Sequence, residues 1–139
     1  MRIMALDIGT KRVGVALSDE LYLIAHSREV IQRTSDRAVI SRLEEIVDEC
    51  GVAEIVVGLP VRLDSTLGER ARDSMRFAEK IKKYIKLPVK LWDERFSTKE
   101  AELVLLEASV TRRKRKKVID KLAAQIILQG YLDRLNADK

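Results

Sequence analysis

The sequence has few of the features that mark secreted and membrane proteins. Its 139 residues include one cysteine, Cys50, so the chain cannot build a disulfide framework, which suits a reducing compartment. No apolar run is long enough to cross a bilayer, and the first residues do not resemble a secretory signal. We therefore expect a cytoplasmic protein with no membrane partner.

Histidine and aromatic residues are also scarce. His26 is the only histidine and lies in a predicted strand, where a lone histidine is more often structural than catalytic. Aromatic residues make up 4% of the chain and are scattered, which argues against a stacking platform for nucleic-acid bases. Recognition of a nucleic acid would then depend on its backbone charge and shape.

The chain lacks internal repeats and linkers rich in proline or glycine, and its one low-complexity segment is a basic run. Hydrophobic residues make up 46% of the sequence, and the length suffices for one packed core but not for two large lobes. We expect a single domain over residues 1–139. The formal net charge of +5 is compatible with a polyanionic partner.

Hydrophobic periodicity predicts an α/β fold. The expected strands cover residues 2–7, 12–18, 27–32, 53–58 and 88–92, and the expected helices cover 35–49, 67–85, 97–108 and 118–135. The first three strands form an antiparallel meander, and the run at 53–58 is almost wholly apolar, as in a strand covered on both faces. The order β-β-β-α-β-α-β-α-α predicts a mixed five-stranded sheet with helices on both faces. In such sheets, sites gather at the carboxyl ends of the parallel strands.

Acidic residues fall at the predicted ends of three elements. Asp7 ends the first strand, Asp93 and Glu94 follow the fifth, and Asp120 begins the last helix. If the first, fourth and fifth strands are neighbours, their carboxyl ends share an edge, and a helix packed on the sheet can bring Asp120 there. Adjacent strand residues point to opposite faces, so Asp93 and Glu94 cannot both be assumed to bind. The extra methylene of Glu94 favours Glu94, with Asp93 as the fallback.

Three converging carboxylates would repel one another, so at least one would take up a proton unless a cation joined them. Mg²⁺ and Mn²⁺ prefer oxygen ligands, and a pair of such ions can activate water and stabilise the leaving oxygen of a phosphodiester. Taken singly, each carboxylate is explained as well by a turn, a helix cap or a surface salt bridge. As a set, they favour a metal site with Asp7, Glu94 and Asp120 as catalytic ligands.

Basic residues lie beside two of these acidic positions. Six consecutive residues just before Asp120 are basic: Arg112, Arg113, Lys114, Arg115, Lys116 and Lys117. Such a run is usually a solvated loop, but its place beside a candidate active site favours a role in gripping phosphates. Lys11 and Arg12 flank the first turn, and they can meet a phosphate or can equally be exposed turn residues.

Four segments occur together in an order typical of one family: ALDIGTKRVGVALSD, VVGLPVRLDSTLGERA, WDERFSTKEAE and IDKLAAQIILQGYL. Over essentially the whole chain they resemble the YqgF/RuvX family of bacterial RNase H-like nucleases. The resemblance implies an RNase H-like fold, metal-dependent nuclease chemistry and a role in maturing the 5′ end of pre-16S rRNA. Members are also described as Holliday junction resolvases.

By motif, Asp7, Glu94 and Asp120 match the family's acidic positions. The segment after Pro60 departs from the family pattern. Arg62 and Asp64-Ser65 stand where the family often has an asparagine and an Asp-Gly pair. The loss of the glycine predicts a different turn, and Arg62 adds positive charge and a candidate contact to nucleic acid.

A phosphotransferase and a non-catalytic binding module are the alternatives to this interpretation. Sugar kinases and actin-like ATPases begin with a similar Asp-x-Gly-Thr turn, but they need a second lobe and a second phosphate loop that this sequence does not show. A non-catalytic nucleic-acid-binding module is disfavoured because the acidic set is retained.

The sequence therefore favours a Mg²⁺- or Mn²⁺-dependent endonuclease that hydrolyses phosphodiesters in structured nucleic acid. Pre-rRNA, within a ribosomal subunit precursor, is favoured over branched DNA as the substrate. A junction resolvase must make two symmetric cuts, so a stable dimer would favour that alternative.

Overall fold

The computed structural model describes residues 1–61, 67–94 and 112–138, and within 112–121 it describes the backbone alone. The strands are β1 (Arg2–Ile8), β2 (Arg12–Ser18), β3 (Ala25–Gln32), β4 (Val52–Leu59) and β5 (Val89–Asp93). The helices are α1 (Asp36–Cys50), α2 (Glu69–Tyr84) and α4 (Arg112–Ala137). The helix expected at 97–108 lies outside the described residues.

The sheet has the predicted mixed topology, with the strand order β3-β2-β1-β4-β5. The β1–β2 and β2–β3 pairs are antiparallel, whereas the β1–β4 and β4–β5 pairs are parallel. The carboxyl ends of β1, β4 and β5 therefore meet at one edge, with β4 in the middle. This arrangement confirms the neighbourhood on which the expected site depends.

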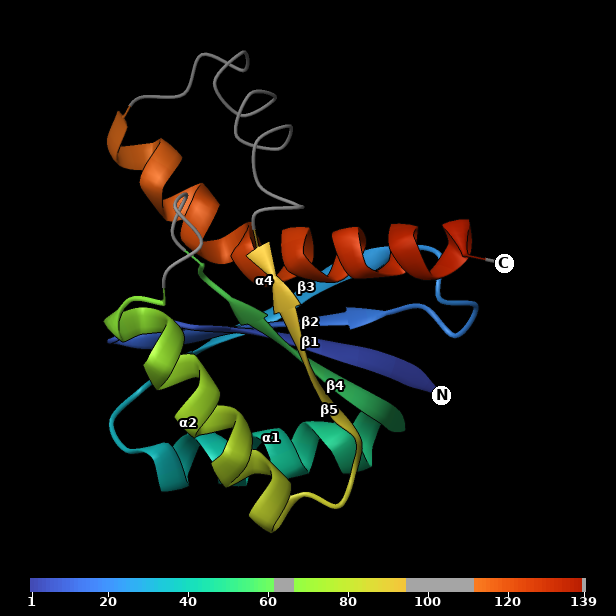
Figure 1. The fold of residues 1–139 in the computed structure, drawn as a ribbon, viewed down its shortest axis with the longest axis horizontal. Helices are drawn as coiled ribbons and strands as arrows, with labels where there is room; N and C mark the ends of the chain where they lie inside the picture. The colour runs from blue at the N-terminus through green and yellow to red at the C-terminus, as the bar shows by residue number, and fades with distance from the viewer. Residues whose placement is uncertain (62–66, 95–111, 139) are drawn as a thin grey trace.

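Helices cover both faces of the sheet, as expected, with α1 and α2 on one side and α4 on the other (Figure 1). Alternation along β1 divides its side chains between the two layers. Met4, Leu6 and Ile8 pack into the core under α1 and α2, while Ile3 and Ala5 pack under α4. Asp7 is the next residue on the α4 side of this alternation.

Local sequence signals explain the bounds of α1. The Ser35 hydroxyl accepts a hydrogen bond from the amide of Ala38 at 3.1 Å, which caps the first turn. Gly51 ends the helix in the left-handed region, with φ of 68°, where glycine carries no steric cost.

The start of α4 differs from the prediction. The last helix was expected from about residue 118, whereas it begins at Arg112 and therefore includes the whole basic run. Arginine and lysine are good helix formers, and residues 112–117 contain neither glycine nor proline to end a helix. The run is a helical segment rather than the solvated loop that such charge runs usually form.

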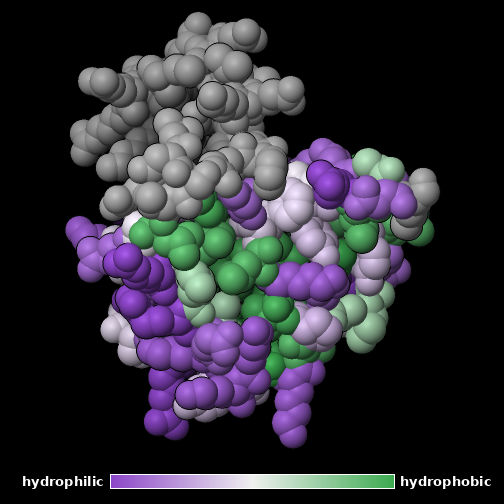
Figure 2. All heavy atoms as spheres, in the orientation of Figure 1, coloured by the Kyte–Doolittle hydropathy of each residue, from purple (hydrophilic) through white to green (hydrophobic). Residues whose placement is uncertain are grey.

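The surface of this view is polar over the outer side of α2 and apolar along a band between the two helical layers (Figure 2). Strand β5 is an edge of the sheet, and its Leu91 is 44% exposed. Among the described residues, no helix combines the length and the apolar character needed to cross a membrane.

Candidate active site

The site begins at Asp7, near the carboxyl end of β1. The chain turns directly after this strand, where the amide of Gly9 donates to the carbonyl of Arg12 at 2.9 Å. The Asp7 side chain is 20% exposed, so its carboxyl is held at the floor of an opening rather than in free solvent. The β1–β2 turn thus presents one partly buried carboxylate beside Gly9, Thr10 and Lys11.

Glu94 lies beside Asp7, although the two residues belong to strands that are not neighbours. It follows β5 directly, on the side of the strand where Trp92 packs against the α4 layer. Burial is the largest cause that raises the pKa of Glu94, and the charge of Asp7 and a side-chain hydrogen bond with Asp7 add to it, against the opposing charge of Arg70. Together these effects raise the pKa from 4.5 to about 7. The structure therefore brings Asp7 and Glu94 together as one interacting carboxyl pair.

Gly58 is the residue that lets the two carboxyls meet. It lies on β4, between the other two strands, and is paired with Trp92 of β5. Neighbouring strands are about 4.8 Å apart, so the Glu94 side chain must cross β4 to approach Asp7. A Cβ atom on residue 58 would lie 2.7 Å from Oε1 of Glu94 and 2.5 Å from Cδ1 of Ile127 in α4. The absence of a side chain at Gly58 therefore makes room for both.

The donor set fits a hard divalent cation. Two carboxyls in mutual contact cannot both ionise without repulsion, and the raised pKa of Glu94 is the consequence of burial and of this contact. A cation between them would remove the repulsion and would find the oxygen ligands that Mg²⁺ and Mn²⁺ prefer. The described side chains contain no group of three His, Cys, Asp or Glu residues able to hold a metal, and the side chain of Asp120 lies outside them.

We expect Gly58→Ala to weaken both the fold and the carboxyl pair. Overpacking a tight site costs about 1 to 3 kcal/mol of unfolding free energy, and displacing Glu94 should weaken Mn²⁺ binding. Urea unfolding and Mn²⁺ titration measure the two effects separately. Adding Ile127→Val removes one of the two clashing atoms, so the double variant should regain stability but not Mn²⁺ affinity. Wild-type Mn²⁺ affinity in Gly58→Ala would show that Glu94 does not need this space.

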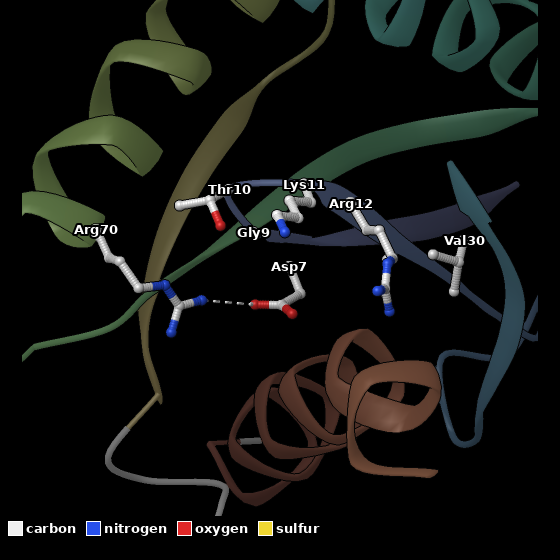
Figure 3. Close-up of a pocket in the computed structure, with 8 residues that line it drawn as sticks. Asp7, Gly9, Thr10, Lys11, Arg12, Val30 and Arg70 are labelled. Carbon is white, nitrogen blue, oxygen red and sulfur yellow. Dashed lines mark ion pairs between the residues drawn. The ribbon is translucent and has the colours of Figure 1, made fainter. Parts of the chain in front are cut away.

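A pocket of about 450 Å³ opens beside Asp7 (Figure 3). Basic side chains line it from two directions: Lys11 and Arg12 from the β1–β2 turn, and Arg70 from the first turn of α2. Arg70 forms an ion pair with Asp7, with 3.9 Å between its guanidinium and Oδ1. Lys11 and Arg12, the candidate phosphate contacts, thus line this pocket, and their role stays a prediction. Arg70 is a site residue that the sequence did not indicate.

Arg33 is a second residue that sequence reasoning missed. Its guanidinium donates to both carboxylate oxygens of Asp73 in α2, at 2.6 and 3.0 Å, and to the carbonyl of Gly9 at 2.9 Å. Its side chain is 11% exposed, and its hydrogen bonds hold the pKa of Asp73 below the usual range. Arg33 therefore ties the turn after Asp7 to α2, one helical turn from Arg70. Nothing in the local sequence distinguishes Arg33 from other arginines, because its partners come from distant segments.

The other predicted site residues fall in less defined places. Asp120 and the basic run from Arg112 to Lys117 belong to α4, but their side chains lie outside the described part of the chain. Arg62 is also outside the described residues. Asp93, the fallback ligand, adds to the rise in the Glu94 pKa through its charge and is the neighbour that alternation turns to the other face. The roles of these residues remain predictions.

Curated relatives resemble the chain over nearly its full length. A protein of Geobacillus kaustophilus is 53% identical over 135 residues, covering 96% of this chain and 98% of its own length. A protein of Desulforamulus reducens is 51% identical over 133 residues, covering 96% and 97%. Both are named "Putative pre-16S rRNA nuclease".

Solved structures share the fold at low sequence identity. RuvC of Thermus thermophilus, solved in complex with a Holliday junction substrate, matches with a TM-score of 0.58 and 13% identity, covering 97% of this chain and 96% of its own. A fowlpox virus resolvase, in complex with Holliday junction DNA, matches with a TM-score of 0.52 and 13% identity, covering 97% and 99%. These likenesses confirm the expected RNase H-like fold. A family model described as RuvX, Holliday junction resolvase, matches residues 1–134, and the chain therefore belongs to the RuvX family.

Proposed function

We propose that this chain is a divalent-metal-dependent endonuclease that hydrolyses phosphodiesters in structured nucleic acid. The observation that carries the proposal is the Asp7–Glu94 pair, in which burial and the contact with Asp7 raise the pKa of Glu94 to about 7 beside a pocket lined by basic side chains. A carboxyl pair of this kind is unfavourable for folding alone and becomes favourable when a cation joins it. Membership in the RuvX family disfavours the sugar-kinase alternative.

The acidic residues have the role of metal ligands in this proposal. Asp7, Glu94 and Asp120 would hold Mg²⁺ or Mn²⁺, which supplies an activated water and charge stabilisation at the phosphodiester when bound. Asp7 offers its carboxyl at the floor of the pocket, and Gly58 keeps open the path by which Glu94 reaches it. The proximity of the two carboxyls is thus built by the sheet before any substrate arrives.

The basic residues hold the nucleic acid by its backbone. Lys11 and Arg12 line the pocket beside Asp7, where a phosphate would meet their positive charges. Residues 112–117 and Arg62 would extend this cationic surface. Such contacts give affinity that falls with salt and carries little sequence information, which suits recognition by shape.

We propose pre-16S rRNA, in a ribosomal subunit precursor in the cytoplasm, as the substrate. Relatives that share about half of their residues with this chain bear a pre-rRNA name, whereas the resolvase structures share 13% of theirs and support the fold alone. Branched DNA is the second candidate because the family model carries the resolvase description.

The test is cleavage by purified protein of end-labelled pre-16S rRNA and of a four-way DNA junction, each with Mn²⁺ and with EDTA. We expect the protein to cut the RNA only when metal is present. This cutting activity should co-elute with the protein in gel filtration. Cutting of the junction alone, by a dimer, would establish the resolvase alternative. Binding of both substrates without cutting of either, in a protein that folds normally, would contradict the catalytic proposal and support a binding module.

A further inference from the structure

Arg70 is placed to act on both the carboxyls and the substrate. It is the second residue of α2 and lines the same pocket as Lys11 and Arg12 (Figure 3). Its guanidinium is 3.9 Å from Oδ1 of Asp7, and its charge also acts on the Glu94 carboxyl. Arg70 is therefore a positive group that acts on both carboxyls of the pair.

The contact between Arg70 and Asp7 is loose. A distance of 3.9 Å is too long for a hydrogen bond, and the Arg70 side chain is 56% exposed. Arg33, which lies between β3 and α1, shows the opposite arrangement: it makes two short hydrogen bonds to Asp73 of α2, and its side chain is 11% exposed. Arg33 therefore fixes α2 against the β1–β2 turn, while the end of the Arg70 side chain can reorient without breaking a hydrogen bond to Asp7.

A divalent cation at Asp7 would compete with Arg70 for the same carboxylate. Carboxylate oxygens approach such ions at about 2.0 to 2.6 Å, much closer than the guanidinium in this structure. The ion would also repel the guanidinium, whose long, exposed side chain can turn into the pocket. A phosphate oxygen is the partner that an arginine leaving a carboxylate would find there, and guanidinium geometry suits it.

We propose that Arg70 exchanges partners: it neutralises Asp7 in the metal-free protein and binds a phosphate of the nucleic acid once a divalent cation occupies the carboxyls. The inference rests on the proposed metal-dependent function and adds a residue and a sequence of contacts to it. It makes Arg70 a competitor of the metal in the free protein and a contributor to nucleic-acid affinity in the metal-loaded protein.

The test separates these two roles without measuring cleavage. Mn²⁺ affinity is measured without nucleic acid by calorimetry, and affinity for the RNA and the junction is measured in Ca²⁺ by fluorescence anisotropy over a series of salt concentrations. The variants are Arg70→Ala, Arg70→Lys and Arg76→Ala. Arg76 is the matched control because it lies on the same helix, is 65% exposed and forms an ion pair of the same length, 3.9 Å, with Asp73.

We expect Arg70→Ala to bind Mn²⁺ about two- to fivefold more tightly, because an exposed competing charge has been removed. Its affinity for nucleic acid in Ca²⁺ should fall, and the slope of log affinity against log salt should shrink by about one. Arg70→Lys should keep the slope, and Arg76→Ala should match wild type in both measurements.

Unchanged or weaker Mn²⁺ binding in Arg70→Ala, or an unchanged salt slope, would overturn the exchange. If wild type binds Mn²⁺ and nucleic acid while Arg70→Ala behaves like Arg76→Ala, the proposed function stands and this inference alone fails. If wild type binds no Mn²⁺, both fail.

Discussion

Asp7→Asn is expected to lower the rate of metal-dependent cleavage by at least about 100-fold while leaving the protein folded. Residues that merely orient a metal ligand typically contribute 10- to 100-fold to activity or metal affinity, so loss of a ligand should cost no less. Asparagine keeps the shape of the side chain but removes the charge that a divalent cation needs. Single-turnover cleavage in Mn²⁺, with thermal unfolding of the same preparation, measures the effect and confirms that the fold persists.

Asp93→Asn is the matched control for this prediction, because it removes the same charge from the residue next to Glu94. Alternation turns Asp93 away from the face on which Asp7 and Glu94 meet, so its loss should change the rate by less than about tenfold. Equal losses in the two variants would assign Asp93 a ligand role. An Asp7→Asn protein with more than a tenth of the wild-type rate would remove Asp7 from the catalytic set.

The strands and their neighbours in the sheet could be predicted from the sequence because the hydrophobic pattern indicates them. The alternating and fully apolar runs predicted β1, β2, β4 and β5 to within about a residue, and the parallel pairing then follows from the intervening helices. That neighbourhood was enough to predict that Asp7 and the acidic residues at the end of β5 share an edge. Glu94 was preferred over Asp93 because its side chain is longer. In the structure, the Glu94 side chain extends past Gly58 of β4 to contact Asp7.

Residues whose role depends on register or on long-range contacts could not be predicted. Gly58 makes room for Glu94 because it pairs with Trp92 of β5 and lies against Ile127 of α4. Neither contact can be read from the sequence around Gly58.

Arg33 and Arg70 act on partners that are distant in sequence: Asp73 is 40 residues from Arg33, and Asp7 is 63 residues from Arg70. Local composition cannot rank them above the many other arginines of a basic chain. The predicted start of α4 was wrong because six consecutive charges are typical of a loop, whereas arginine and lysine also favour helix.

Glu94→Gln is expected to make the metal-free protein more stable at high pH, because it removes a buried charge. The folded protein holds the Glu94 proton up to a pKa of about 7, whereas the unfolded chain releases it near 4.5. The folded state thus binds more protons between these values, and the stability this gives is fully present below pH 4.5 and is lost as the pH rises through 7. Each pKa unit corresponds to about 1.4 kcal/mol, so the charged carboxylate costs on the order of 3 kcal/mol of unfolding free energy at pH 8.

Glu94→Gln should therefore be more stable than wild type at pH 8 in EDTA, by about 3 kcal/mol or roughly 10 °C in Tm. At pH 4 the two proteins should differ little, because wild-type Glu94 is then protonated. Urea unfolding between pH 4 and 9 measures the difference. Glu79→Gln removes the same charge from a side chain that is 69% exposed, and its effect should stay within about 0.5 kcal/mol at every pH.

Metal should reverse the ranking of the two proteins. Mn²⁺ binds the folded wild-type protein and stabilises it by mass action, while Glu94→Gln, which lacks one carboxylate, should gain much less. Wild type would then be the less stable protein in EDTA and the more stable one in saturating Mn²⁺ at pH 8. A variant that is destabilised equally at pH 4 and pH 8, and equally with and without Mn²⁺, would show that Glu94 serves packing alone. This reversal distinguishes a carboxylate that binds a cation from one that only packs in the fold. Only a cation-binding carboxylate makes the metal-free wild type less stable than its Glu94→Gln variant.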